Sequence, residues 1–375
     1  MSETILITGG KGFIGSHVAG ALLRRGHRVR VLDNLLEQVH GKGGTTVELP
    51  GAELPGDVEL QVGDVRDEVA VARALKGVDA VIHLAAEVGV GQSMYAVDRY
   101  VSVNDLGTAT LLQRLIANPV RRVVVASSMS IYGEGLYRTA DGDPVEDVMR
   151  PERQPGSSWD PLDRQGRPLI PAPTPEWKRP MLASVYALTK YCQERLVLTV
   201  AGAYGMQAAA LRMFNVYGPG QALSNPYTGV LAIFASRILN GQRPLVFEDG
   251  QQRRDLVHVS DVAEAFALAL EHPKAAGGVF NVGSGRERTV LETAQALADA
   301  MGRPELEPEL VGKARAGDVR HCFADIGKAQ AELGFAATKD FGEGLAELAE
   351  WVAAQQAVDR VAEARRELES RGLVA

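Results

Sequence analysis

The chain has little cysteine, since only Cys192 and Cys322 occur among its 375 residues. Two thiols are too few for a disulfide framework or a cysteine metal cluster, and this scarcity is typical of a reducing cytosol. The seven histidines show no HExxH or similar metal-binding spacing. We therefore expect a cytoplasmic protein without a metal site.

Long hydrophobic runs are also absent. No apolar stretch reaches the roughly 18 residues that a membrane-spanning helix needs, and Met1 to Gly10 enters an apolar strand without a basic leader or a cleavage pattern. The formal net charge of −7 repels nucleic acid at long range. We expect neither a membrane nor a nucleic acid as partner, and an anionic small ligand would need a local cluster of arginines.

The pattern that is present is an alternation of strands and helices. Apolar residues make up 46% and charged residues 23% of the chain, which is ordinary globular usage. Runs rich in Val, Ile and Leu alternate with stretches of helical period, which predicts an α/β fold with a Rossmann-type, doubly wound parallel sheet. Shorter elements beyond Asn281 predict a smaller C-terminal α/β lobe. The expected strands are Thr4–Thr8, Arg28–Leu32, Val58–Val62, Ala80–Ala85, Arg122–Ala126 and Gln207–Leu211.

Two segments depart from this alternation. Residues 134–183 hold nine of the 18 prolines, together with Trp159 and Trp177. This insertion either drapes over the surface or forms a rim over the substrate, since it lies between two candidate active-site motifs. The tail from Ala353 to Arg371 is amphipathic and helical, and no chemistry is predicted for it.

A glycine-rich turn follows the first expected strand. Gly9, Gly12 and Gly15 permit a tight turn, close approach of backbone to a pyrophosphate and close helix packing, while the next helix begins with free N–H groups. Asp33 ends the second strand, where its carboxylate would accept hydrogen bonds from a ribose 2′-hydroxyl and repel a 2′-phosphate. This context predicts NAD rather than NADP, although Asp33 is alternatively a solvated capping residue.

Asp64 and Val65 follow the third expected strand. At that position they would meet the adenine edge of a bound dinucleotide. The alternative is that Asp64 caps the helix that follows it.

A candidate proton relay lies in the middle of the chain. Tyr186 and Lys190 are four residues apart in a helical stretch, so their side chains share one face. A neighbouring ammonium and a positive nicotinamide ring would lower the pKa of the tyrosine. Ser128 ends the fifth expected strand at its carboxyl end, where open α/β sheets bind ligands. Together these three residues can take a proton from a hydroxyl group.

The chain contains a series of motifs, which follow one another in this order: TGGKGFIGSH, LDN, GDVRD, HLAA, residues 104–107, SSMSIYG, YALTK, LRMFNVYGPG, RRDLVHVSDVA, FNVGSG and RAGDVRHCFADI. From about Thr4 to about Trp351 the chain resembles the extended short-chain dehydrogenase/reductase family, namely its NAD-dependent nucleotide-sugar epimerases and dehydratases.

The resemblance implies a role for each matching residue. Tyr186 is the general base, Lys190 binds the nicotinamide ribose and tunes the tyrosine, and Ser128 hydrogen-bonds the reacting oxygen. The implied cofactor-binding residues are Gly9, Gly12, Phe13, Ile14, Gly15, Asp33, Asn34, Asp64, Val65, Leu84, Ala85, Ala86, Asn104, Tyr186 and Lys190. The implied substrate-binding residues are Asn215, Arg254, Arg315 and Cys322. Guanidinium groups suit the oxygens of a nucleotide diphosphate.

The resemblance also divides the chain. It implies an NAD-binding domain at 1–214 and about 255–276, with the insertion 134–183, a nucleotide-sugar lobe at 215–254 and 277–352, and a helical tail at 353–375. Family members often dimerise through two long helices from each subunit, which correspond here to Tyr95–Asn118 and Ser184–Tyr204. A homodimer is therefore expected.

The reaction is inferred from two residues that differ from the dehydratase pattern. The family's 4,6-dehydratases carry an acid and a base directly after the strand-five hydroxyl, and Met129 and Ser130 stand there instead. Neither can perform the elimination, so inversion at C4 through a transient 4-keto sugar is the favoured reaction. The alternative enzymes are a decarboxylase or net oxidoreductase acting on UDP-glucuronate, and a nucleotide-sugar dehydratase or reductase of the same family. A redox-sensing NAD-binding regulator is the alternative without catalysis, which Ser128, Tyr186 and Lys190 disfavour.

The substrate remains open between two resemblances. Cys322 and the GDVRHxxADI run are similar to features of UDP-N-acetylhexosamine epimerases, although Cys322 is equally well a buried small hydrophobe. The SSMSIYGEGLYR motif and the long insertion resemble a subgroup of deoxysugar enzymes labelled dTDP-L-rhamnose 4-epimerase. The second resemblance is preferred, and UDP-glucuronate is a further alternative.

Overall fold

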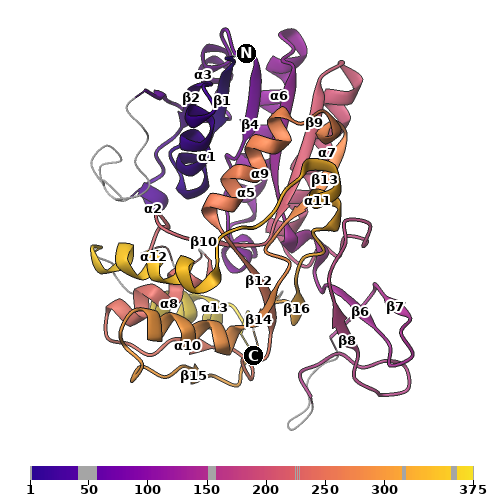
Figure 1. Cartoon of the computed structure of the whole chain (residues 1–375), viewed down its shortest axis with the longest axis vertical. Coiled ribbons are helices and arrows are strands. Elements are labelled where there is room, and N and C mark those ends of the chain that lie inside the picture. Colours follow the sequence, from indigo (N-terminus) through magenta and orange to yellow (C-terminus); the bar gives the residue numbers. More distant parts are fainter. Residues whose placement is uncertain are drawn as a thin grey trace.

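A computed structural model describes residues 2–40, 57–150, 158–223, 225, 227, 229–314, 318–355 and 361–374. Figure 1 shows a larger lobe that contains the main sheet, a smaller lobe below it that contains the chain's C-terminus, and a small sheet that projects beside the smaller lobe.

Seven parallel strands form the main sheet in the order β13-β9-β5-β4-β1-β2-β3. Strands β1, β4 and β5 are buried over their whole length, because Val, Ile, Leu and Ala fill both of their faces. The strands are β1 (Thr4–Thr8), β2 (Arg28–Asp33), β3 (Glu59–Val62), β4 (Ala80–His83), β5 (Arg122–Ser128), β9 (Gln207–Met213) and β13 (Gly278–Val282). All six expected strands are present.

Helices cover both faces of this sheet. One apolar core joins it to α1 (Phe13–Arg24), α9 (Val259–Glu271) and α11 (Gly327–Leu333). A second core on the opposite face joins it to α3 (Glu68–Ala74), α6 (Gly107–Ala117) and α7 (Val185–Ala203). The predicted doubly wound fold is confirmed.

Short elements connect these helices and strands. They are α2 (Glu37–His40), α4 (Val90–Ser93), α5 (Val97–Tyr100), the π-helical η1 (Val101–Leu106), and the 3₁₀ turns η2 (Met129–Tyr132) and η3 (Pro273–Ala275). Helix α7 begins at a capped end, because the Ser184 side chain accepts a hydrogen bond from the backbone N–H of Ala187. This cap places Tyr186 in the first turn of the helix and Lys190 in the second.

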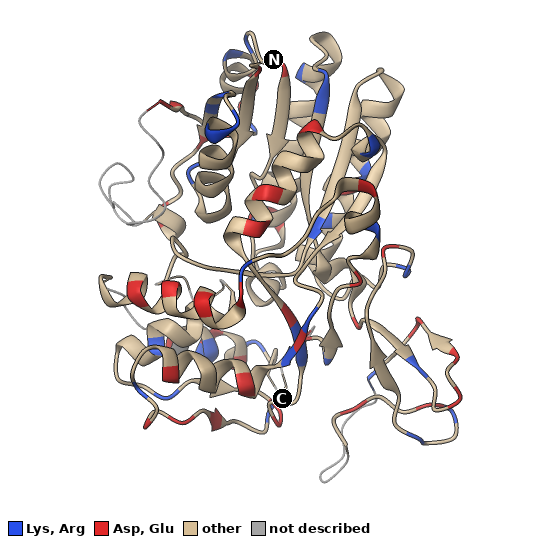
Figure 2. Ribbon diagram, in the orientation of Figure 1, with Lys and Arg blue, Asp and Glu red and all other residues tan. Residues whose placement is uncertain are grey.

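The smaller lobe combines short strands with three helices. Its sheet contains β10 (Asn215–Tyr217), β12 (Arg253–His258), β14 (Glu287–Thr289) and β16 (His321–Cys322), and a separate pair joins β11 (Leu245–Val246) to β15 (Glu309–Leu310). A third apolar core lies among α8 (Val230–Leu239), α10 (Val290–Ala300) and α12 (Phe341–Ala353). Figure 2 shows acidic residues along α12 and both signs of charge on β12. The last helix is α13 (Val361–Ser370).

The expected domain boundary at residue 277 needs correction. Strand β13 pairs in parallel with β9 and is the edge strand of the main sheet, and Ala329 and Leu333 of α11 pack in the same core. Residues 278–282 and 327–333 therefore belong to the larger lobe. Conversely, β12 belongs to the sheet of the smaller lobe.

The described part of the insertion at 134–183 is folded. Its three strands pair antiparallel in the order β7-β6-β8, where β6 is Leu136–Arg138, β7 is Pro144–Val145 and β8 is Ile170–Ala172. Tyr137, Val148 and Leu169 form a small core of their own. Figure 1 shows this sheet at the side of the smaller lobe.

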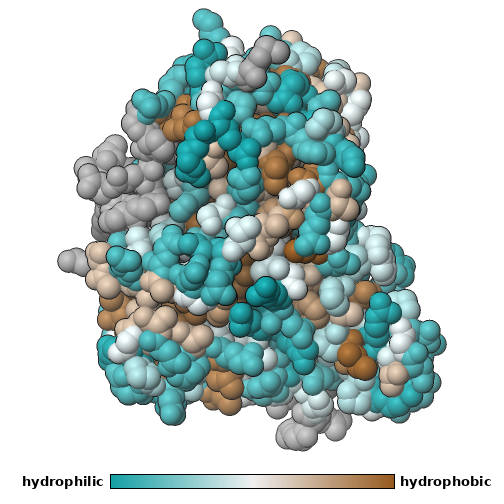
Figure 3. All heavy atoms as spheres, in the orientation of Figure 1, coloured by the Kyte–Doolittle hydropathy of each residue, from teal (hydrophilic) through white to brown (hydrophobic). Residues whose placement is uncertain are grey.

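The surface shown in Figure 3 is mainly hydrophilic, with hydrophobic side chains scattered over it. None of the described helices has both the length and the apolar character of a membrane span.

Candidate functional site

Two adjoining cavities lie at the carboxyl ends of the main strands, as open α/β sheets lead one to expect. The first has a volume of about 320 Å³, and the second, towards the smaller lobe, has about 420 Å³. Five residues border both: Val88, Ser128, Tyr186, Phe214 and Val216. The two cavities thus meet at the predicted serine and tyrosine.

The glycine-rich turn forms one wall of the first cavity. Gly9 has φ +70°, and a Cβ atom there would lie 2.8 Å from the backbone nitrogen of Ala85. A Cβ atom on Gly15 would lie 2.5 Å from the Cα atom of Gly10. The N-cap of α1 is Gly12, so no side chain satisfies the first N–H groups of this 12-residue helix. The turn is therefore shaped to receive an anion.

Two carboxylates stand further along this cavity. Asp33 accepts hydrogen bonds from the backbone N–H groups of Lys11 at 3.0 Å and Leu35 at 2.9 Å. His40 Nε2 lies 3.4 Å from Asp33 Oδ1, whereas Oδ2 keeps a further lone pair for a ribose hydroxyl. The guanidinium of Arg66 hydrogen-bonds Asp64 at 2.7 and 2.8 Å and holds the pKa of that carboxyl at about 2. Both groups present negative charge to the cavity.

Every predicted cofactor-binding residue except Asn104 lines the first cavity. Asn104 is fully buried. Its side chain bonds both the N–H of Glu87, at 2.7 Å, and the carbonyl of Glu87, at 3.1 Å, and donates to Thr189 Oγ1 at 2.9 Å. The structure thus places Asn104 behind the cavity wall, where it fixes the loop after β4. The residue in the cavity is Glu87, which pairs with Arg99 at 2.7 Å.

Of the three residues predicted to form a proton relay, Ser128 and Tyr186 border both cavities and Lys190 lines the first. Burial raises the pKa of the Tyr186 phenol above its ordinary value, and a hydrogen bond with the Ser128 hydroxyl opposes this rise. Ser128 Oγ also accepts the backbone N–H of Ser130 at 3.2 Å. The ring of Tyr100 stands edge-on to that of Tyr186, with 6.4 Å between centroids. A hydroxyl group entering the second cavity can therefore contact both proton-carrying side chains.

A buried polar network holds Lys190. Its ammonium donates to Gln193 Oε1 at 2.8 Å, and Gln193 donates in turn to Thr108 Oγ1 at 2.8 Å. His83 bonds Thr108 Oγ1 at 2.8 Å through Nε2 and Thr8 Oγ1 at 2.7 Å through Nδ1. Burial lowers the pKa of Lys190 to about 7 and that of His83 to about 3. Sequence reasoning missed Gln193 and His83, although His83 begins the HLAA motif.

A buried ion pair fixes α7 against the sheet. Glu194 of α7 accepts from Arg212 of β9 at 2.7 and 3.0 Å, and both side chains are almost completely buried. The Ser127 hydroxyl donates to the same carboxylate at 2.7 Å, and Arg212 donates to the Tyr132 hydroxyl at 2.9 Å. This pair sets the distance between Tyr186 on α7 and Ser128 on β5.

The structure treats the four predicted substrate residues differently. Asn215 and Arg254 line the second cavity, and the buried Oδ1 of Asn215 has no partner among the described residues. The structure does not bring Cys322 to the cavity; it is buried with Met129 and other apolar side chains, and burial raises its pKa to about 12. Arg315 lies outside the described residues.

The lining of the second cavity carries few acids or bases. Met129 and Ser130 border it, as expected from their place after Ser128. Among the described lining residues the single carboxylate is Asp318, which lies 3.4 Å from the guanidinium of Arg254.

The C-terminal segment also forms part of this cavity, which sequence reasoning did not predict. Ala364, Arg365 and Leu368 of α13 line it, together with Leu373. A Cβ atom on Gly91 would lie 3.4 Å from Leu368, so α13 packs against α4. The amphipathic spacing of the tail was visible in the sequence, but its packing partner was not.

These features define an α/β enzyme that binds a dinucleotide beside a second ligand at a Ser–Tyr–Lys centre. Residues 5–154 and 171–283 match the NAD dependent epimerase/dehydratase family. The chain belongs to this NAD-dependent family, as its motifs had indicated.

Three known proteins illustrate the likeness. A dTDP-L-rhamnose 4-epimerase from Burkholderia thailandensis is 36% identical over 364 residues, with 96% of each chain covered. The UDP-glucose 4-epimerase structure from Thermotoga maritima, with UDP-glucose, has a TM-score of 0.74 at 31% identity and covers 93% of this chain and 98% of its own. The UDP-glucose 4-epimerase structure from Thermus thermophilus, with NAD, has a TM-score of 0.71 at 32% identity and covers 94% and 100%.

The pKa of Lys190 predicts a specific pH dependence of stability. Because this pKa is lowered from 10.5 to about 7 in the folded chain, the unfolded chain binds more protons between these values, and the free energy of unfolding rises with pH. Lys190→Met removes this contribution. We expect its stability advantage over the parent protein, measured by urea denaturation without NAD, to be largest at pH 7 and to shrink towards pH 10.

The matched control is Lys76→Met, since Lys76 is exposed. Its stability difference from the parent protein is expected to stay constant over the same range. A Lys190→Met difference that is equally constant would contradict the lowering of the Lys190 pKa by burial.

Proposed function

We propose that the chain is an NAD-dependent nucleotide-sugar 4-epimerase that inverts C4 through a transient 4-keto sugar. The observation that carries the proposal is that Ser128 and Tyr186 border both cavities. A dinucleotide in the first cavity and a sugar in the second would meet at these two side chains. The likeness to 4-epimerases supports this assignment.

The proposed roles combine this geometry with the family resemblance. NAD, when bound, supplies a reversible hydride acceptor. Tyr186 takes the proton of the C4 hydroxyl, Ser128 hydrogen-bonds the reacting oxygen, and Lys190 holds the nicotinamide ribose next to them. The glycine turn receives the pyrophosphate, Asp33 the adenosine ribose, and Asp64 and Val65 the adenine edge. The 4-keto sugar then turns about its diphosphate link, and the tyrosine returns the proton when the other face is reduced.

The choice of epimerase over dehydratase rests on the second cavity. Elimination needs an acid for the leaving hydroxyl and a base for the C5 proton. Met129 and Ser130 offer neither next to Ser128, and Asp318, the one carboxylate among the described lining residues, is paired with Arg254. Relatives with dehydratase names are nevertheless about as similar as several epimerases.

For the substrate we propose a nucleoside-diphosphate deoxyhexose such as dTDP-L-rhamnose. The relative from Burkholderia thailandensis supports this class over the full chain. Asn215 and Arg254 would hold the diphosphate, because both line the second cavity and a guanidinium suits phosphate oxygens. UDP-N-acetylhexosamines and UDP-glucuronate are the alternative substrates. Because Cys322 does not line the cavity, one argument for UDP-N-acetylhexosamines is lost.

The enzyme is further proposed to act as a cytoplasmic homodimer. Val97, Val101, Leu106 and Leu188 are exposed apolar side chains on α5, η1 and α7, and these elements pack against one another. The expected pairing helices lie in the same segments. A second copy of the chain would cover these side chains, since contiguous exposed apolar surface favours association.

Activity is tested with a panel of dTDP- and UDP-sugars, in which proton NMR reports a changed C4 coupling constant. Tyr186→Phe is expected to lower turnover by about 100-fold or more, because the general acid–base is lost. Its NAD affinity should stay near that of the parent protein. Retained turnover would refute the assignment of the base, and NADH accumulating in proportion to product would favour net oxidation over epimerisation.

The C-terminal wall of the second cavity yields another prediction. A chain that ends at Gln355 lacks α13 and therefore exposes the sugar-nucleotide cavity to water along one side. We expect its affinity for the substrate to fall about ten-fold, equivalent to roughly 1.4 kcal/mol, with NAD affinity unchanged. Titration calorimetry measures both. Equal substrate affinity in the two chains would show that α13 contributes nothing to binding.

The dimer proposal is tested by Leu188→Glu. A carboxylate in an apolar interface is costly to bury, so sedimentation should show a shift from dimer to monomer at micromolar concentration. Ile170→Glu is the control, because Ile170 is also exposed but lies on the insertion. A parent protein that sediments only as a monomer would overturn the proposal.

A further inference from the structure

The described part of the insertion at 134–183 does not form a rim over the second cavity. Among its described residues only Ala183, at its very end, lines that cavity. Several of its other described residues, among them Glu134, Gly135 and Asp160, contact the back of the cavity wall instead. The wall in question is the segment Asp318–Cys322, of which Asp318 and Val319 face the cavity.

The start of the insertion binds the backbone of this segment. The buried carboxylate of Glu134 accepts the N–H of Arg320 at 2.7 Å and the N–H of His321 at 3.2 Å. The hydroxyl of Tyr137 donates to the same carboxylate at 2.6 Å. Gly135 N–H donates to the carbonyl of His321 at 2.8 Å. A single carboxylate thus orders two consecutive peptide groups.

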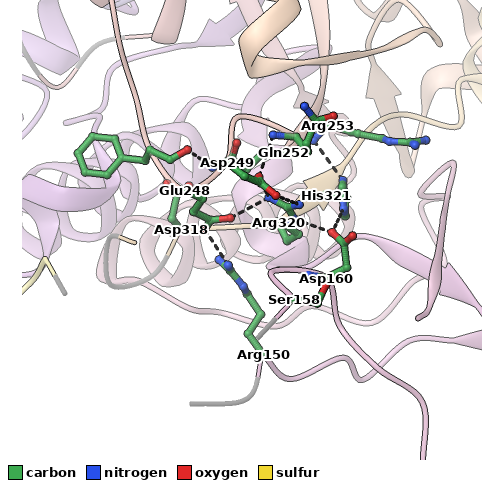
Figure 4. A network of polar contacts seen from close by, with 12 residues as sticks. Arg150, Ser158, Asp160, Glu248, Asp249, Gln252, Arg253, Asp318, Arg320 and His321 are labelled. Atoms are coloured by element: carbon green, nitrogen blue, oxygen red, sulfur yellow. Dashed lines mark hydrogen bonds and ion pairs between the residues drawn. The ribbon is translucent and has the colours of Figure 1, made fainter. Parts of the chain in front are cut away.

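The side chain of Arg320 ties the same segment to two further parts of the chain (Figure 4). Its guanidinium is almost completely buried. It donates to Asp160 of the insertion at 2.7 Å, and to Asp249 at 2.6 and 3.0 Å. It also donates to the buried Glu248 at 3.0 Å. These charge-assisted hydrogen bonds hold the guanidinium in a single orientation.

Glu248 itself is held in a sparsely populated backbone conformation. Its φ is +56°, in the left-handed region that non-glycine residues rarely adopt. Arg150, another residue of the insertion, pairs with its carboxylate at 2.7 Å, as Figure 4 shows. The adjacent Phe247 lines the second cavity. The insertion therefore steadies a second stretch of the cavity wall.

His321 adds a directed bond between the same partners. Its Nδ1 accepts the backbone N–H of Arg253 at 3.2 Å, so its Nε2 carries the proton and donates to Asp160 at 3.1 Å. Burial lowers the pKa of His321, and the hydrogen bond to Asp160 opposes this. Asp160 thus receives donors from both Arg320 and His321.

This arrangement orients Arg254, a cation that lines the second cavity. Its guanidinium donates to the carbonyls of Arg253 at 2.9 Å and Arg320 at 3.0 Å, and also to the carbonyl of Val319. The direction of these carbonyls depends on the path of residues 318–321. Any shift of that path would turn Arg254 away from the cavity.

We propose that the proline-rich insertion is a positioning element for the sugar-nucleotide cavity, and that Asp160 acts through Arg320 to orient Arg254 and Asp318. This inference rests on the proposed function. According to this inference, the insertion contributes to the affinity for the nucleoside diphosphate. It does not contribute to the chemical step at Tyr186.

The test uses the full-length protein with Asp160→Asn and Asp160→Ala. The Asp160 side chain is 41% exposed, so the chain should still fold. Both donors meet Asp160 Oδ1, so Asn keeps this acceptor but loses its charge, whereas Ala keeps neither. We expect the dissociation constants of dTDP and UDP, measured by titration calorimetry, to rise about ten-fold for Ala and less for Asn, as loss of a charged hydrogen bond predicts. KM for the nucleotide sugar should follow, with kcat and NAD affinity unchanged.

Asp141→Asn is the matched control. Asp141 lies on the same insertion and pairs with Arg167 on the exposed surface, so its loss should leave every constant unchanged. Arg320→Lys is a second variant that retains the charge but cannot bridge three carboxylates. It should reproduce the Asp160→Ala pattern, with NAD affinity reporting an intact larger lobe.

Three outcomes would overturn the inference: unchanged dTDP and UDP affinity in Asp160→Ala, a parallel loss of NAD affinity, or a fall in kcat at constant KM. Failure of the proposed function looks different, because the unmodified protein would then invert C4 of no nucleotide sugar in the panel, whatever its affinity for dTDP and UDP.

Discussion

The whole site depends on the ion pair between Glu194 and Arg212 under the sheet's carboxyl edge. Helix α7 carries Tyr186 and Lys190, whereas β5 carries Ser128, and the polar bridge between them runs through this pair and Ser127. Because both charges are buried, either one alone would be strongly unfavourable. The pair therefore fixes the position of α7 along the sheet, and with it the position of the first turns of this helix. The position of α7 in turn sets where Tyr186 and Lys190 lie relative to Ser128.

The elements that sequence predicted well are those whose signals are local. The Val- and Ile-rich strands β1 and β5, the glycine turn and the four-residue spacing from Tyr186 to Lys190 all follow from short-range chemistry. Strand β13 was assigned to the wrong lobe, because Gly278–Val282 is short and nothing in it indicates pairing with β9. That information resides in the crossover through α9, which only tertiary packing reveals.

The site shows the same division. Motif positions that line a cavity through backbone or through directly adjacent side chains, such as Gly12 and Asp33, were found. Asn104 and Cys322 were expected in the cavities but lie behind their walls, because a motif records that a residue type is needed without recording the direction of its side chain. The contributions of α13 and of Asp160 come from segments distant in sequence, where no local pattern identifies the partner.

Charge explains why such positioning matters for this chain. With a net charge of −7, the long-range field repels a dinucleotide and a nucleoside diphosphate alike, and salt screens that field within about 8 Å. Around Arg320, the carboxylates Glu134, Asp160, Glu248 and Asp249 outnumber the guanidinium groups of Arg320 and Arg150. This cluster therefore does not attract an anion by itself. Affinity has to come from donors aimed at short range, and the described residues offer among these the uncapped start of α1 and the guanidinium of Arg254. Such hydrogen-bond donors contribute to affinity only while the backbone that orients them stays rigid. In the smaller lobe the insertion supplies part of that rigidity.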